Sequence, residues 1–371
     1  MLKFTAREPN KVYLERFVIM ATLLVPSICM QGFRALAVGV FGVLLCMAVD
    51  LICCLIRKIP YDPKDAAVPF WGLAMALMLP VSVPFALEAA AAVVCIAVGK
   101  HLFGASDNIV FCPPAIAAAF LIICYPSETL FFPKYGEKIP VFEEYGGVLT
   151  RSAEYSIKLG NVPSGSVWDI LMGFVPGAVG TVYILVILVC GISMICHRSN
   201  SGCAVISCLI TAGVLAFFFP RISVSGFESV FYELSSGYLL FGTVFLAAEP
   251  HRTPEKAAGR VIYGMVLGYI TMMFRFFGQT EGSFLFALLI TGALGSSFDR
   301  VVENVVYWKR TYVNSFEKSK TQVQRGDIKL TDTQEIVLPE KYRYNTPPID
   351  GEVKKKRRRR REDKGDDNEK K

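Results

Sequence analysis

The sequence predicts an all-α polytopic membrane protein with about ten transmembrane helices, arranged as two inverted five-helix halves. The class follows first from composition: hydrophobic residues make up 53% of the 371 residues, charged residues only 19%, and the mean hydropathy is +0.43. Soluble domains are rarely this apolar. The apolar residues also gather into long runs without the alternation of β-strands, which indicates membrane helices.

Ten apolar runs carry this prediction. They occur at about 16–31, 34–56, 66–83, 85–103, 113–126, 168–196, 203–219, 229–248, 258–276 and 282–299. Several contain proline, as at Pro26, Pro80 and Pro176, which is typical of kinked or broken membrane helices. We therefore expect a membrane domain at 16–303, preceded by a cytoplasmic N-terminus at 1–15.

A repeated sequence pattern predicts the two halves. The stretch from Trp71-Gly72 to Pro80 and the stretch from Phe241-Gly242 to Pro250 both read aromatic, glycine, seven residues, proline. The two copies run in opposite directions in the predicted topology, as inverted repeats of transport proteins do. Coincidence among apolar sequences of low complexity is the alternative explanation.

Basic residues in the short connections set the expected orientation. Arg57-Lys58, Lys100 and Arg260 fall on the side that both termini share, so that side is predicted to be cytoplasmic. The opposite side receives one long polar loop at 127–167. No cleavable signal is expected, because the first apolar run leads into further spans.

The C-terminal segment 304–371 differs in composition from the rest of the chain. Charges of both signs dominate it, and Lys354–Arg361 is an unbroken basic run. We expect a cytoplasmic, largely disordered tail of basic and mixed charge, since such segments do not fold alone. It either reinforces topology or attracts anionic membrane lipids. Nucleic-acid binding is excluded beside ten spans.

The eleven cysteines predict no chemistry. They lie almost entirely in or beside apolar runs, form no C-x-x-C pair, and are missing from the long polar segments. Buried cysteine behaves as a small hydrophobic residue, so we expect neither a metal site nor a disulfide framework.

Four segments resemble one family of redox-driven pumps. They are KHLFGASDNIVFCPPA from Lys100, LMGFVPGAVG from Leu171, SGYLLFGTVFLAAEPHRTP from Ser236, and the stretch from Gly259-Arg260 through Arg275 and Glu281-Gly282 to Asp299. Their order and content resemble the NqrB/RnfD family, whose members are membrane subunits of the Rnf complex and of the homologous sodium-pumping NADH:quinone reductase. The resemblance covers about 30–300, and several motifs in order make it specific.

The resemblance implies a fold, an activity and partners. Family members are ten-span inverted-repeat subunits of a redox-driven Na⁺ or H⁺ pump in the bacterial inner membrane. The chain would then be inactive alone and would work with other Rnf-type membrane subunits and with flavin and iron–sulfur subunits. The family carries one FMN on a threonine of the outer face, through a phosphoester, and a second flavin can bind noncovalently within the spans.

Ser152 lies where that threonine is expected. Aligning Gly147-Val148-Leu149-Thr150-Arg151-Ser152 with the family pattern Gly-Val-Ser-Thr-Ala-Thr gives Ser152 as the candidate covalent FMN site. Serine offers the same hydroxyl as threonine. Arg151 replaces the small residue beside the acceptor, and Glu154 brings a negative charge that repels a phosphate. A plain surface serine is the alternative.

Three further charged residues are candidates within the predicted membrane domain. Arg275 and Glu281 flank the outer turn between the last two spans, where they could pair with each other or face a flavin or ion path. An arginine whose head reaches water is the simpler explanation for Arg275. Glu88 is either an ion ligand or an acid that complements a helix N-terminus.

Several polar positions of the family pattern are replaced here. Cys112, Phe174, Thr181 and Gly292 stand where the family has asparagine or glutamate. Since polar groups inside membranes are usually functional, their replacement favours an alternative: a divergent member without flavin that acts as a solute or ion transporter or as a scaffold of the complex.

Overall fold

The computed structural model describes residues 9–102, 110–142, 145–163, 165–197, 201–249, 253–254, 256–278, 281–295, 297–298, 300 and 303–304. The chain divides into two compact units, Met1–Tyr307 and Trp308–Lys371, and every described residue belongs to the first unit. The predicted disordered tail therefore lies outside the described residues, apart from Asn304.

The described part is built almost entirely of helices. Its first section comprises α1 (Pro9–Ala21), α2 (Leu24–Gln31), α3 (Phe33–Arg57), α4 (Ala67–Leu77), α5 (Phe85–Val93), the π-helix η1 (Val94–Leu102) and α6 (Pro113–Cys124). A connecting segment follows with α7 (Pro126–Thr129), β1 (Phe131–Phe132), β2 (Thr150–Arg151), α8 (Ala153–Lys158) and α9 (Val167–Met172). The last section comprises α10 (Ile184–Cys196), α11 (Gly202–Phe218), α12 (Gly226–Ser235), α13 (Leu239–Gly242), the π-helix η2 (Thr243–Ala247), α14 (Ala257–Met273), the π-helix η3 (Phe274–Gly278) and α15 (Ser283–Ala293).

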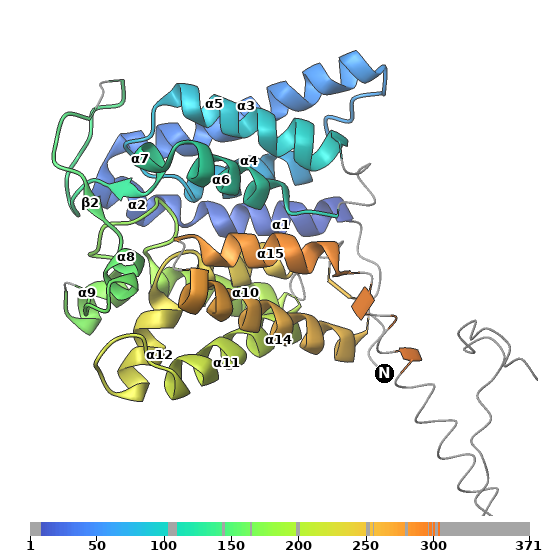
Figure 1. Cartoon of the computed structure of the whole chain (residues 1–371). Helices are drawn as coiled ribbons and strands as arrows, with labels where there is room; N and C mark the ends of the chain where they lie inside the picture. The colour runs from blue at the N-terminus through green and yellow to red at the C-terminus, as the bar shows by residue number, and fades with distance from the viewer. Residues whose placement is uncertain are drawn as a thin grey trace, which may run out of the picture. The chain divides into compact units, whose positions relative to one another are not determined.

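The long helices of the first unit lie beside one another along their lengths. Figure 1 shows α1 to α6, in blue to teal, next to α10 to α15, in yellow to orange. The elements β2, α8 and α9 of the connecting segment gather at one end of this bundle. The polar residues that the sequence predicted as an outer loop thus form a small structured layer at the helix ends.

Four helical segments are long and apolar enough to cross a membrane. They are Asn10–Gln31, Phe33–Arg57, Phe85–Leu102 and Ala257–Gly278, and a bent pair formed by Gly226–Ser235 and Leu239–Ala247 makes a fifth. Five other apolar helices have 10–17 residues, fewer than the ~20 that span the hydrocarbon core. The described residues therefore show a mostly helical protein with four to five clear spans, and the count of ten stays a prediction.

Two predicted spans are interrupted by the backbone. The run 168–196 is not one helix: α9 ends at Met172, Gly173 adopts φ 83°, and α10 begins only at Ile184. The bent pair turns by 65°, and Gly237 between its helices has φ 66°. Glycine takes this left-handed conformation without strain, so the chain can break a membrane helix at both places.

Glycine also allows a very close helix contact in the first section. A Cβ on Gly72 of α4 would lie 2.9 Å from the carbonyl oxygen of Gly42 and 2.9 Å from Cα of Val43 in α3. The backbones of the two helices therefore touch directly, as small residues permit in membranes. α4 is buried along almost its whole length, so it forms the centre of the first section.

Buried aromatic residues connect the two sections. Trp71 donates to Glu249 through its indole Nε1 at 2.8 Å, and the Tyr13 hydroxyl donates to the same carboxylate oxygen at 2.9 Å. Glu249 follows η2 and is only 1% exposed. An acidic group in the last section is therefore held by donors from α1 and α4.

Candidate functional site

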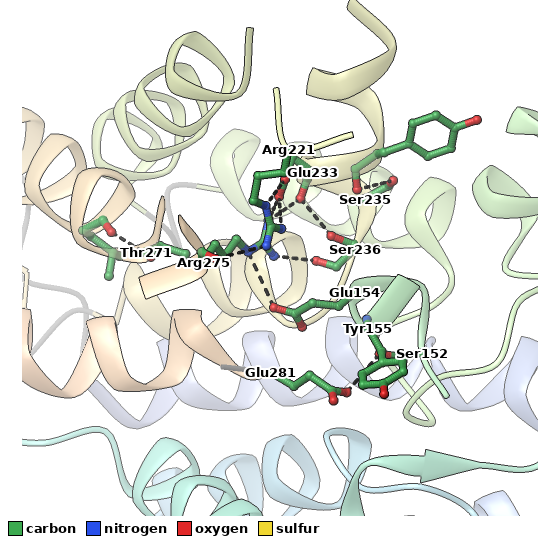
Figure 2. A network of polar contacts seen from close by, with 12 residues as sticks. Ser152, Glu154, Tyr155, Arg221, Glu233, Ser235, Ser236, Thr271, Arg275 and Glu281 are labelled. Atoms are coloured by element: carbon green, nitrogen blue, oxygen red, sulfur yellow. Dashed lines mark hydrogen bonds and ion pairs between the residues drawn. The ribbon is translucent and has the colours of Figure 1, made fainter. Parts of the chain in front are cut away.

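Ser152 begins helix α8 within the connecting segment. Strand β2 pairs antiparallel with β1, with Arg151 opposite Phe131, and the chain then turns into the helix. The Ser152 hydroxyl accepts from the backbone N–H of Tyr155 at 3.3 Å, the usual helix N-cap contact of serine. It also donates to Oε2 of Glu281 at 3.3 Å, as Figure 2 shows. Ser152 is half-buried, so its hydroxyl is held in place and still reachable.

Arg151 places a positive charge beside this hydroxyl. Its guanidinium carbon lies 3.8 Å from the ring centre of Phe131 and 4.5 Å from that of Tyr155. Its Nη1 is 3.1 Å from Oε1 of Glu281. Two aromatic faces and one carboxylate therefore hold the guanidinium, while a third of the side chain stays exposed. Such cation–π contacts are favourable when partly desolvated.

Glu281 receives both contacts. It lies just before α15, is 7% exposed, and offers one oxygen to Arg151 and the other to Ser152. Burial raises the pKa of this carboxyl, the negative charge of Glu154 raises it further, and Arg151 opposes both effects. The sequence indicated Ser152 and Glu281 separately, and the structure brings them together.

Arg275 belongs to an adjoining buried network. Its Nη1 donates to Oε2 of Glu233 at 2.8 Å and to the Glu233 carbonyl at 2.6 Å, and its Nη2 donates to the Ser236 carbonyl at 2.9 Å. Arg221 binds the two oxygens of the same carboxylate at 2.6 and 2.8 Å. The Nε of Arg275 is 3.6 Å from Oε1 of Glu154. Figure 2 shows how these side chains converge from α8, α12 and η3.

The position of Arg275 bears on two of the possibilities drawn from the sequence, a head in water and a pair with Glu281, and leaves a flavin or ion path as a prediction. Its side chain is 1% exposed, so its head does not reach water. Its carboxylate partners are Glu233 and Glu154, whereas Glu281 pairs with Arg151. The family motifs do not mark Glu233, although a charged residue inside the apolar run 229–248 is itself a signal of a buried partner.

A small cavity joins the two groups. It measures about 40 Å³, and its lining includes Ser152, Glu154, Thr181, Ser236 and Glu281. A volume of this size admits a few water molecules and excludes a three-ring cofactor. Any large group attached at Ser152 must therefore extend away from the cavity.

A second polar cluster lies where α3 meets the end of η1. Oδ1 of Asp50 accepts from Lys100 Nζ at 2.9 Å and lies 2.8 Å from Nε2 of His101. Arg57 places its Nη1 3.3 Å from Nδ1 of the same imidazole. Ligand atoms of Asp50, Cys54 and His101 lie within 4.8 Å of one another. Since Lys100 already pairs with Asp50 and with Asp65, both at 2.9 Å, the arrangement favours an ion-pair cluster over a metal centre.

Comparison with known proteins defines the class. The NQR2, RnfD, RnfE family matches residues 5–307. Together with the apolar helices, this match makes the chain a multi-pass membrane protein. The chain belongs to this family, which confirms the resemblance drawn from the motifs.

Individual relatives are similar at modest identity. The D subunit of the ion-translocating oxidoreductase complex of Stutzerimonas stutzeri is 26% identical over 66% of this chain and 76% of the relative. The D subunit of the Na⁺-translocating ferredoxin:NAD⁺ oxidoreductase complex of Acetobacterium woodii is 24% identical over 76% and 87%. The D subunit of the proton-translocating ferredoxin:NAD⁺ oxidoreductase complex of Clostridium ljungdahlii is 20% identical over 75% and 86%.

Proposed function

We propose that this chain is a membrane subunit of an Rnf-type electron transport complex that couples flavin-mediated electron transfer to movement of Na⁺ or H⁺. Membership of the family over residues 5–307 is the observation that supports this most. The proposal includes ten spans, a place in the bacterial inner membrane with cytoplasmic termini, and partner subunits that carry flavin and iron–sulfur groups. Alone, the chain would not be active.

The proposed attachment point for FMN is the Ser152 hydroxyl. The residues around it fit a phosphate ester, because Ser152 is half-buried at the rim of the cavity and Arg151 supplies a cation next to it. An ester oxygen can still accept from the Tyr155 N–H, so attachment need not disturb the start of α8. When bound, a flavin supplies a group that accepts and releases electrons.

Each neighbouring side chain has a role in this proposal. Ester formation would join Oγ of Ser152 to the FMN phosphorus of a flavin dinucleotide, break the phosphoanhydride bond so that the other half leaves as a nucleoside monophosphate, and free the hydroxyl proton. Glu281, 3.3 Å away, is placed to accept that proton. Arg151 would offset the phosphate charge, and Arg275 holds the Glu154 carboxylate at 3.6 Å. A second, noncovalent flavin within the spans stays a prediction.

The proposal is tested by locating covalent flavin. The chain is co-expressed with its complex partners and a flavin transferase, denatured, and examined on a gel under ultraviolet light, followed by peptide mass analysis. We expect fluorescence and an FMN-sized addition on the peptide that contains Ser152. Ser152→Ala removes both, and Ser152→Thr keeps them because threonine offers the same hydroxyl. Thr150→Ala, which removes the neighbouring hydroxyl, is the matched control and stays fluorescent.

One observation favours the second candidate function, a flavin-free transporter or scaffold. The carboxylates of Glu154 and Glu281 both line the cavity beside Ser152, and negative charges repel a phosphate. A dark band from a complex that still assembles would support the scaffold. A dark band together with solute or ion movement by the isolated chain would support the transporter.

A further inference from the structure

Glu88 of α5 is a buried acid that the proposed flavin site does not use. Its side chain is 0% exposed. Neither carboxyl oxygen has a hydrogen-bond partner among the described residues. Oε1 points at the crossing of α3 and α4, since a Cβ added to Gly42 would lie 2.9 Å from this oxygen and 2.9 Å from Cβ of Ala76.

An ionised carboxylate in this place would be very costly. A charge buried without a hydrogen-bonded partner loses its hydration with little to offset the loss, so burial favours the neutral form. Arg34 is the one charged side chain within the described ranges that acts on Glu88, and donors of its guanidinium go to the carbonyls of Val81, Val83 and Pro140. The hydrogen bonds that Glu88 lacks are therefore not supplied by Arg34.

The surroundings favour a proton over a metal cation as the neutralising group. Metal cations that bind carboxylates need several oxygen ligands around them. Beside Oε1 of Glu88, the atoms nearest to an added Gly42 Cβ are Cβ of Ala76 at 2.9 Å and the carbonyl oxygen of Gly72 at 3.2 Å. A proton needs only the carboxyl itself.

The buried residues of α3 extend from Gly42, beside Glu88, through Cys46 to Asp50. Residues four apart are neighbours on a helix surface. Asp50 lies eight residues beyond Gly42, about 12 Å along the axis. There its carboxylate contacts His101 at 2.8 Å, and histidine is the side chain best suited to pass protons. At the other end, the positive charge of Arg34 opposes the passage of protons.

We propose that Glu88 is a proton-binding carboxyl inside the membrane and that it exchanges its proton with the Asp50–His101 pair along the buried face of α3. This site lies on other helices than Ser152. It does not depend on a bound flavin, and it goes beyond the proposed electron-carrying role. Glu88 and the polar cluster at the end of η1 thereby have a chemical role, the binding and exchange of a proton.

Infrared spectroscopy of the full chain in its purified complex tests the binding site. A protonated carboxyl has a C=O stretch that shifts in D₂O, and we expect Glu88→Gln to remove one such band at neutral pH. Glu88→Asp, which keeps a carboxyl, should move the band instead. Glu137→Gln is the control, because Glu137 is exposed and its ionised group contributes no such band. An unchanged spectrum in an assembled Glu88→Gln complex would overturn the proposal.

The same spectra separate a proton from a metal cation. Added Na⁺ at fixed pH should leave the Glu88 band unchanged. If Na⁺ removes the band, a metal cation takes the place of the proton and the assignment is wrong. The flavin content of the same preparation is read independently by fluorescence, so failure at Ser152 and failure at Glu88 cannot be confused.

The route is tested by the rate at which the Glu88 band shifts after transfer to D₂O. Asp50→Asn should slow this exchange at least several-fold, because it removes the acid that contacts His101. Asp62→Asn is the matched control: Asp62 is exposed and its carboxylate accepts from the backbone N–H of Lys64. Equal rates in wild type and Asp50→Asn would overturn the proposed route.

Discussion

At the residue scale, the Arg275 network is the most consequential set of contacts in the described residues. One guanidinium, 1% exposed, faces the carboxylates of Glu233 and Glu154, and Arg221 completes the group. Each charge in this set is stabilised mainly by the others, because the side chains are largely shielded from solvent. Removing one partner of such a group leaves a buried charge uncompensated.

We therefore expect Arg275→Gln to lower the free energy of unfolding by about 3–5 kcal/mol. The reason is that Glu154 loses its cation and Glu233 keeps only Arg221. Thermal unfolding of the purified protein in detergent measures the change. Lys256→Gln is the control, since Lys256 pairs with Glu303 on the surface and exposed pairs contribute little. Equal melting temperatures for the two variants would contradict this prediction.

A single acid at the start of α9 gives a pH-dependent prediction. Asp169 accepts from the backbone N–H and the hydroxyl of Ser166, both at 2.8 Å. These hydrogen bonds lower the pKa of Asp169. A folded-state pKa below the unfolded one gives stability that is present above the unfolded value of 3.8 and is lost as the pH falls through the folded value.

We expect α9 to open first as the pH is lowered below 3.8. Amide hydrogen exchange at 167–172, measured at several pH values, reports this opening. Asp169→Asn should be less protected at neutral pH, and its protection relative to the intrinsic exchange rate should not change with pH, because the amide cannot carry the charge that the capping contacts favour. Opening of α9 in wild type that does not change below pH 3.8 would contradict the argument.

Part of the site could be predicted from the sequence at this scale. The family motifs mark Ser152, Glu281 and Arg275, and the structure places all three in or beside one polar region. Glu233 is not marked, since its contact with Arg275 spans 42 positions of the chain and no local spacing encodes such a distance. Whether Ser152 carries flavin stays a prediction.

At the element scale, the apolar runs located helices better than they located breaks. The run 34–56 corresponds closely to α3 at Phe33–Arg57, and the run 85–103 to α5 with η1. The run 168–196 did not predict the irregular segment after Gly173. Hydropathy depends on side chains alone and does not reveal a backbone turn. A glycine with positive φ marks such a turn, but its φ is known only once the neighbouring residues are placed.

The contact of α3 with α4 leads to an element-scale prediction. Gly72→Ala places a methyl group 2.9 Å from backbone atoms of Gly42 and Val43, which cannot move aside as a side chain can. We expect overpacking to lower the free energy of unfolding by about 1–3 kcal/mol, measured by thermal unfolding.

Gly213→Ala in α11 is the matched control, because its new Cβ meets side-chain atoms of Val230 and Leu234 no closer than 3.5 Å. Alanine favours helices over glycine, so the control should be neutral or more stable. A Gly72→Ala protein as stable as the control would contradict the close backbone contact.

At the scale of the whole molecule, the two sections are joined by side-chain contacts that cannot be predicted from any single stretch of the sequence. Glu249 after η2 is held by Trp71 and Tyr13 from the first section. Two grounds led to the prediction of inverted halves, the repeated aromatic-glycine-proline pattern and the family resemblance. The described residues confirm a helical membrane protein of this family, and the number of spans needs a measurement of its own.

Labelling of single cysteines tests which sides of the membrane the connections occupy, which the ten-span topology specifies. In a background without the eleven natural cysteines, Val148→Cys lies in the exposed connecting segment and Lys64→Cys lies in the exposed turn between α3 and α4. The predicted topology with cytoplasmic termini puts these two positions on opposite sides of the membrane, because three predicted spans lie between them. A maleimide that cannot cross the inner membrane should then label Val148→Cys in intact cells and label Lys64→Cys only after lysis. Labelling of both in intact cells would contradict a membrane between them, and the reverse pattern would invert the orientation and move Ser152 to the cytoplasmic side.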